Sequence, residues 1–227
     1  MMNGSMGWPR GAREEVDPDS GGKRPWWYYP DNPTVWDDDF LGDSLDPKWT
    51  VVKNEMDSYE VANGSLILRG ASTTGQFAAV QPMPSGAWAA STRIIGAGGN
   101  YTYGNGGGPI AADNATTTGY QWMSVGNPGN SSGNPAFYTN NNRLTNYGYS
   151  GDWTYISQTM YPEFHRLAYD GAGTLTASYS LNGASWTVYG SIGSTAPTHV
   201  GFIVTSFNND AGSGAICIVD SFRMELL

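Results

Sequence analysis

Carboxylates are the residues of this 227-residue sequence whose chemistry is most easily tested by spacing. Hydrolysis of a glycosidic bond with retention needs two of them about 5 Å apart across the sugar. The glucanase spacing E-x-D-x-E does not occur, and Asp113 is the only acid between Glu60 and Asp152. We therefore predict that the protein is not an enzyme. The alternative is that acids distant in the sequence converge in space.

The sequence also gives little indication of a catalytic nucleophile or of a metal site. The string G-x-S-x-G at residues 129–133 works only as an elbow between a strand and a helix, and here prolines flank it. His165 and His199 both begin predicted strands, which favours a structural role, and no zinc spacing or EF-hand loop occurs. Some acids offer oxygen ligands for calcium, but we interpret them as solvated turn residues and expect no metal and no cofactor. These acids are Asp37, Asp38, Asp39 and Asp210.

Aromatic side chains give the clearest binding signal. They lie in or beside three long loops rich in Gly and Asn, at residues 96–108, 126–135 and 140–152. Flat ring faces stack on the apolar face of a sugar while amides bond its hydroxyl groups. The alternative is that the core buries most of these rings. The predicted carbohydrate-binding residues are Tyr101, Tyr103, Tyr149 and Trp153.

Composition and charge exclude several partners. Eleven basic and twenty acidic residues give a net charge of −9, whereas phosphate binding needs clustered Lys and Arg. We therefore expect neither nucleic acid nor a membrane as a partner. No segment approaches the ~18 apolar residues of a transmembrane helix, and the start of the sequence lacks the apolar core of a secretory signal. Cys217, the only cysteine, lies in an apolar run and is expected to be buried and inert.

Residues 1–36 differ from the rest of the sequence. Five prolines remove any strand or helix period, so we predict an extended arm. Trp and Tyr are typical interface anchors, which indicates that the arm fixes the protein to a partner chain. The competing interpretation is that the arm covers a sheet edge of its own domain. The predicted anchors are Trp8, Trp26, Trp27, Tyr28 and Tyr29.

From residue 37 to 227 the pattern is that of β-strands. Two hairpins are predicted, with turns at residues 63–64 and 170–173. The strand at 174–180 alternates apolar and polar residues, and 200–205 reads as a central strand. In the last strand Asp220 falls on the same face as Ile216, Ile218 and Phe222, so either a bulge turns it out or it has a buried partner. The predicted fold is an all-β, two-sheet antiparallel jelly-roll sandwich.

Three stretches carry a family resemblance. Residues 38–49 (DDFLGDSLDPKW) have the form of a first strand and turn. Residues 164–186 contain FHRLAYDG and then YSLNGASW, and the segments 200–202 and 219–224 have the form of closing strands. In this order they resemble the concanavalin A-like (laminin-G-like) lectin/glucanase superfamily. The resemblance implies a jelly roll over residues 37–227 but not a function, because this fold hosts lectins, glycosidases and display modules.

Together these features predict a non-catalytic decoration or tail protein on the surface of a bacteriophage virion. Its arm binds other virion proteins, and its lectin-like domain displays a surface that binds glycans of a cell or of the environment. We expect it to be an oligomer within that assembly and to reach the outside by lysis. The alternatives are a free carbohydrate-binding protein and, third, a glycosidase with an unusual acid pair.

Overall fold

A computed structural model describes residues 34–52, 58–70, 76–98, 106–112, 120–122, 136–139, 152–155, 162–193, 196–205 and 215–227. The secondary structure of these residues is entirely β, without a helix, and so they contain no helix that could cross a membrane. The predicted anchors of the arm, Trp8, Trp26, Trp27, Tyr28 and Tyr29, lie outside the described residues, as does the arm up to residue 33.

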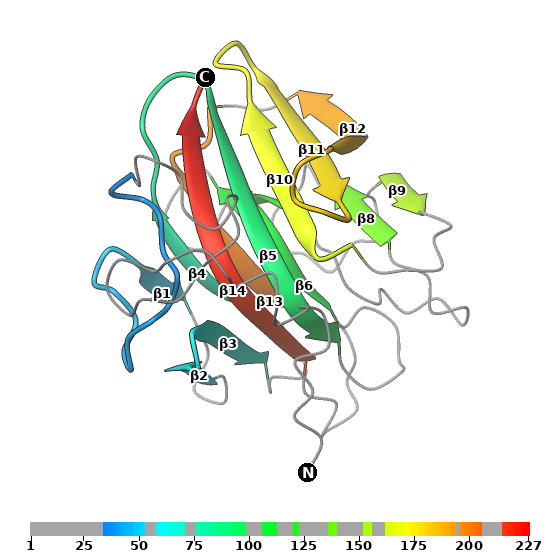
Figure 1. Cartoon of the computed structure of the whole chain (residues 1–227). Helices are drawn as coiled ribbons and strands as arrows, with labels where there is room; N and C mark the ends of the chain where they lie inside the picture. The colour runs from blue at the N-terminus through cyan, green and yellow to red at the C-terminus, as the bar shows by residue number, and fades with distance from the viewer. Residues whose placement is uncertain are drawn as a thin grey trace.

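Two antiparallel sheets form a sandwich, which confirms the predicted fold class (Figure 1). The seven-stranded sheet has the order β12-β11-β10-β5-β14-β3-β2 and lies in front in Figure 1. Its strands are Thr187–Gly193, Thr174–Ser180, Phe164–Tyr169, Trp88–Gly98, Ala215–Leu226, Ser65–Gly70 and Ser58–Ala62 in that order. Strands far apart in the sequence, such as β5 and β14, therefore lie side by side at the centre.

The five-stranded sheet lies behind, in the order β1-β4-β13-β6-β7. Its strands are Thr50–Val52, Gln76–Pro82, His199–Thr205, Gly106–Ala112 and Tyr120–Trp122. A separate ribbon pairs β8 (Ala136–Thr139) with β9 (Asp152–Tyr155). Residues 200–204 are buried between β4 and β6, which confirms the predicted central strand.

Both predicted hairpins are present, because turn chemistry is local. Asn63 and Gly64 join β2 to β3 with φ of 55° and 71°, the left-handed values of a type I′ turn. The second hairpin pairs β10 with β11 in continuous register from Phe164–Ser180 to Tyr169–Leu175. Its turn is fixed by Asp170, whose Oδ1 accepts hydrogen bonds from the backbone N–H groups of Ala172 and Thr174.

The core between the sheets is centred on aromatic rings. Trp49, Phe202 and Phe222 have ring centroids 5.3 to 5.6 Å apart, and Phe40 joins them at about 6 Å. These rings come from the opening segment, from β13 and from β14, so both ends of the domain are fixed to one core. Backbone hydrogen bonds of 3.0 and 2.8 Å between Asp38 and Phe222 confirm that the opening segment lies beside the last strand.

A bulge in β14 changes the face that the sequence pattern predicts. The register against β5 shifts around residues 219–221, so the inward side chains are Cys217 and Val219 before the bulge and Phe222 and Met224 after it. The prediction that Ile216 and Ile218 share the core face with Phe222 was therefore wrong. Cys217 is buried, as predicted, and burial raises the pKa of its thiol to about 12.

Candidate functional site

The predicted carbohydrate-binding residues lie mostly outside the described part of the chain. Tyr101, Tyr103 and Tyr149 belong to segments that the structure does not describe, and Trp153 is placed by its backbone alone. Trp153 stands in β9 directly opposite Tyr138 of β8. The sugar site at these residues therefore stays a prediction.

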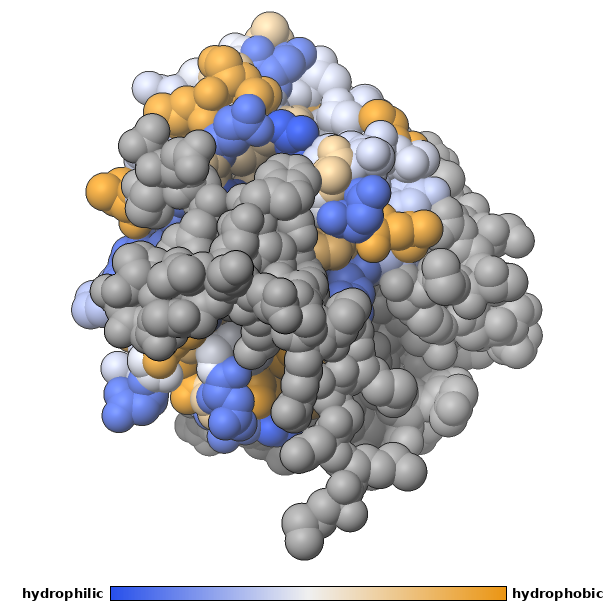
Figure 2. Space-filling model, viewed as in Figure 1, coloured by the Kyte–Doolittle hydropathy of each residue, from blue (hydrophilic) through white to orange (hydrophobic). Residues whose placement is uncertain are grey.

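The described residues place charged side chains on the outer face of the seven-stranded sheet, the face that points away from the five-stranded sheet. Strand register puts these residues in transverse rows across β11, β10, β5 and β14. One row is Ser180, Phe164, Arg93 and Ser221, and the next is Ser178, Arg166, Ser91 and Arg223. The coloured part of this face in Figure 2 shows hydrophilic and hydrophobic residues side by side.

An ion cluster is centred on Arg93 of the first row and is here named the Arg93 cluster: Arg93, Glu163 and Asp220. The Arg93 guanidinium donates from Nε and Nη2 to Glu163 Oε2 at 2.9 and 2.8 Å, and from Nη1 to Asp220 Oδ2 at 2.8 Å. The side chains of Arg93 and Asp220 are only 1% and 5% exposed. The Arg93 guanidinium also lies 5.9 Å from the ring centroid of Phe164, so charge and ring are buried together.

Local structure explains why the Arg93 cluster forms. The bulge at residues 219–221 brings Asp220 to the outer face beside Arg93. The sequence predicted either a bulge or a buried partner for Asp220, and the structure has both. Glu163 precedes β10, and its carbonyl accepts the backbone N–H of Ile94 at 2.7 Å, which holds it beside β5. Sequence analysis missed Arg93 and Glu163. The only signal was the unexplained acid in an apolar strand.

Two acids that are distant in the sequence lie close together in space, as the alternative to a local acid pair predicted. Both, however, bind the guanidinium of Arg93. Glu163 and Asp220 are 57 positions apart in the sequence and bind the same guanidinium. A general acid must give its proton to a leaving group, and a nucleophile must reach the sugar. In this structure both carboxylates bind one arginine, whose side chain is 1% exposed.

The histidine of β10 lies on the other side of that strand. His165 is 1% exposed and pairs by register with Thr92 and Tyr179. Burial lowers its pKa to about 3, against a smaller opposing effect of a hydrogen bond to the Pro162 backbone. The ring is therefore neutral at ordinary pH and a weak base, and its Nδ1 has no hydrogen-bond partner in the structure as described.

The acids considered for calcium are engaged in fixing the opening segment. Asp37 accepts hydrogen bonds from Thr34 and from the backbone N–H of Met224. Asp38 Oδ2 accepts the indole N–H of Trp49 at 2.7 Å.

Asp39 completes this set by pairing with Arg223 of β14. Within the described ranges no three His, Cys, Asp or Glu side chains group as a metal site requires, and Asp210 lies outside those ranges. The described acids of this segment therefore hold the opening segment in place, and Asp37 and Asp39 bind residues of the last strand.

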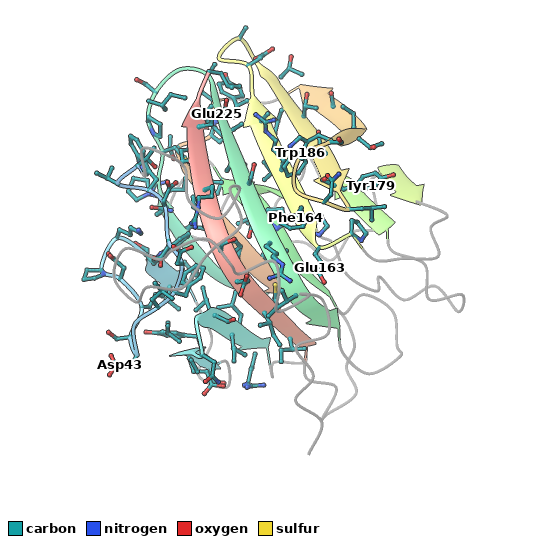
Figure 3. The ribbon with its side chains drawn as sticks, in the orientation of Figure 1. Asp43, Glu163, Phe164, Tyr179, Trp186 and Glu225 are labelled. Carbon is teal, nitrogen blue, oxygen red and sulfur yellow. The ribbon has the colours of Figure 1, made fainter. Side chains whose placement is uncertain are left out.

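A second, more open cluster is centred on Arg166 of the next row and is here named the Arg166 cluster: Arg166, Trp186 and Glu225. The guanidinium of Arg166 lies 5.7 Å from the ring centroid of Trp186, and its Nη2 donates to Glu225 Oε2 at 2.8 Å. Figure 3 labels Trp186 beside β10 and β11 and Glu225 near the end of β14. The side chains of Arg166 and Glu225 are 24% and 65% exposed.

The tight turn after β11 positions Trp186. Asn182 Oδ1 accepts the backbone N–H groups of Ala184 and Ser185, both at 2.9 Å, and Ser180 Oγ accepts that of Gly183. A side chain at Gly183, whose φ is 74°, would approach the Phe164 ring to 3.2 Å. Glycine therefore lets the turn lie against the outer face and deliver Trp186 to Arg166.

Comparisons with known proteins show a likeness of fold. No protein-family profile matches the sequence, and no curated protein is significantly similar to it. Among solved structures, the xylan beta-1,4-xylosidase from Bacillus Halodurans C-125 is similar over 87% of this chain and 40% of its own, with 16% identity and a TM-score of 0.60. The chain therefore spans less than half of that enzyme.

Two further solved structures are similar over most of their length. The exoplasmic/lumenal domain of VIP36, in its Ca2+/Man3GlcNAc-bound form, has 14% identity and a TM-score of 0.53, with 80% of this chain and 86% of that chain covered. The cellulose induced protein Cip1 has 12% identity and a TM-score of 0.51, with 83% and 96% covered. At these identities the chain is similar to them in its jelly-roll β-sandwich fold.

Proposed function

We propose that this chain is a non-catalytic jelly-roll module that binds glycans. The observation that carries the proposal is the Arg93 cluster, in which the two converging carboxylates share one buried cation instead of flanking a substrate. The names of similar structures support a carbohydrate ligand: a xylosidase, and a lumenal domain in a Man3GlcNAc-bound form. The loops rich in Gly, Asn and aromatic residues supply the chemistry that sugar binding needs.

Binding without hydrolysis is the first test. The purified chain is applied to a glycan array and, in parallel, incubated with β-glucan, xylan and peptidoglycan while reducing ends are measured. We expect retention of at least one glycan and no release of reducing ends. Reducing ends that disappear on Asp113→Asn or Asp152→Asn substitution would show a glycosidase, and an array without any bound glycan would remove the binding function.

Loop aromatics are the predicted contacts for that glycan. Replacing Tyr101, Tyr103, Tyr149 or Trp153 by Ala is expected to weaken binding by about 1 to 2 kcal/mol, which is about 5- to 30-fold. Tyr59 is 40% exposed on β2 and provides a matched Tyr→Ala control. Equal losses for Tyr59→Ala and the loop variants would mean that the loops are not the site.

We propose further that the module belongs to the surface of a bacteriophage virion and is anchored by residues 1–36. Five prolines and five large aromatic residues of this arm support the idea, because prolines favour an extended segment and Trp and Tyr are typical interface anchors. Deleting residues 1–24 is expected to leave a folded, soluble domain that no longer joins particles. Stoichiometric assembly of the truncated chain would show that the arm is not the anchor, and a chain never found in particles would favour a free carbohydrate-binding protein.

A further inference from the structure

The Arg166 cluster has an arginine whose hydrogen-bonding capacity is only partly used. A guanidinium carries five N–H donors, and Arg93 uses its Nε, Nη1 and Nη2 on two carboxylates. The Nη2 of Arg166 binds Glu225, whereas its Nε is inaccessible to water and has no hydrogen-bond partner in the described structure. Among its described contacts, the guanidinium of Arg166 therefore has one hydrogen bond, to Glu225, and its side chain is 24% exposed.

The existing partner of Arg166 is easily displaced. Glu225 is 65% exposed, and an ion pair open to water contributes little because solvent screens it. A ligand carboxylate that replaced Glu225 would give up little and would gain charge-assisted hydrogen bonds to the guanidinium.

The surroundings of Arg166 suit a ring-shaped ligand. The register places Ser178 and Ser91 on either side of Arg166 in its row, and Ala168 and Ala89 beside each other in the next row. These side chains are small; Ser91 and Ala168 are partly exposed beside Arg166, while Ala89 and Ser178 are buried. The partly buried Trp186 adds an aromatic ring, and indole is the strongest stacking surface for sugars among side chains.

We propose that Arg166 and Trp186 form a subsite for a carboxylated sugar, such as a uronic acid residue of an acidic glycan. The sugar carboxylate replaces Glu225 on the guanidinium, and the pyranose ring lies against Trp186. The inference rests on the proposed glycan-binding function and adds the class of sugar and a second region of contact beside the predicted loops.

The test uses the full chain, trigalacturonic acid and its methyl ester, which is the same sugar without charge. Affinities are measured by calorimetry at about 0.15 M salt, where the Debye length of about 8 Å limits repulsion from the acidic protein. We expect the acid to bind about tenfold more tightly than the ester, and Arg166→Lys, which keeps the charge but loses the planar fork, to remove that preference.

Glu225→Gln distinguishes this proposal from a structural role. Removing the competing carboxylate is expected to tighten binding of the acid several-fold and to leave the ester unchanged. The matched control is Glu60→Gln, which removes the same charge from the exposed Arg69–Glu60 pair and should have no effect on either ligand. A rise in affinity of equal size in both variants would mean only a change in net charge.

Four outcomes overturn the inference. Equal affinity for acid and ester, or an unchanged preference in Arg166→Lys, removes the subsite while binding of neutral glycans on the array leaves the proposed function intact. Absence of any glycan binding would contradict both the subsite and the proposed glycan-binding function. Tighter binding of a tetraglutamate peptide than of trigalacturonic acid would identify an acidic protein segment as the ligand of Arg166 instead of a sugar.

Discussion

The two arginine clusters on the outer face both pair a guanidinium with carboxylates, but they differ in how far the charges are buried. Arg93 and Arg166 stand in adjacent rows of one sheet, each beside an aromatic ring and each paired with carboxylates. The Arg93 side chain is 1% exposed and binds two acids, while that of Arg166 is 24% exposed and binds one acid that is itself open to water. Burial turns the first cluster into a part of the fold and leaves the second free to exchange partners.

The largest effect should come from the buried cluster. Arg93→Met is expected to lower the free energy of unfolding by about 3 to 5 kcal/mol, because the Asp220 carboxylate stays buried without its cation. Urea unfolding followed by tryptophan fluorescence measures the loss. Arg166→Met is the matched control and should lose about 1 kcal/mol or less. Equal losses at the two positions would end the distinction between the clusters.

Acidic pH should lower the free energy of unfolding through His165, which lies on the opposite face of β10 from the two arginine clusters. Its pKa of about 3 in the folded protein lies below the ordinary 6.5, so the unfolded chain binds the proton first. The stability linked to this residue is complete above pH 6.5 and is lost as the pH falls toward 3. Between pH 6.5 and 4.5 this is about 2 to 3 kcal/mol.

His165→Gln tests that pH dependence, because Gln does not titrate. The free energy of unfolding is measured at pH 6.5 and 4.5 in both proteins, and the fall should be smaller in the variant. His199→Gln serves as the control, since burial also lowers the pKa of His199 but the side chain is only partly buried. An identical fall in the His165 variant and the parent would assign the acid sensitivity to other groups.

The turn before Trp186 should have an intermediate effect that reaches only the exposed cluster. Asn182→Ala removes the acceptor of two backbone N–H groups and is expected to cost about 1 kcal/mol. The acid preference of the Arg166 subsite should weaken with it, because Trp186 is no longer held in place. Asn182→Asp keeps the acceptor and should retain both properties, so a loss in that variant would contradict the role given to the turn.

The smallest effect on stability is expected at Glu225. Glu225→Gln should change the free energy of unfolding by less than about 1 kcal/mol, since the pair with Arg166 is exposed. Thermal unfolding at two salt concentrations measures it, and salt should reduce even this difference. A loss comparable to that of Arg93→Met would show that the Arg166 cluster is also a structural element.

Features that depend on neighbouring residues could be predicted from the sequence. The turns at Asn63-Gly64 and at Asp170 and the apolar run of β13 follow from local conformational preference and burial period, and they are present. In β11 the predicted alternation holds only from Thr174 to Ala177: the register against β12 shifts after Ala177, and Ser178 and Ser180 are buried. The all-β class follows from the same signals.

Which distant residues meet depends on the order of the strands in the sheet. Arg93 meets Glu163 and Asp220 at separations of 70 and 127 positions, and Arg166 meets Glu225 at 59. Strand order and one bulge create these pairs, and neither leaves a short-range mark in the sequence except an acid in the apolar strand β14. Burial then separates a structural ion cluster from an exchangeable one, because the dielectric around a charge depends on the whole fold and not on its sequence neighbours.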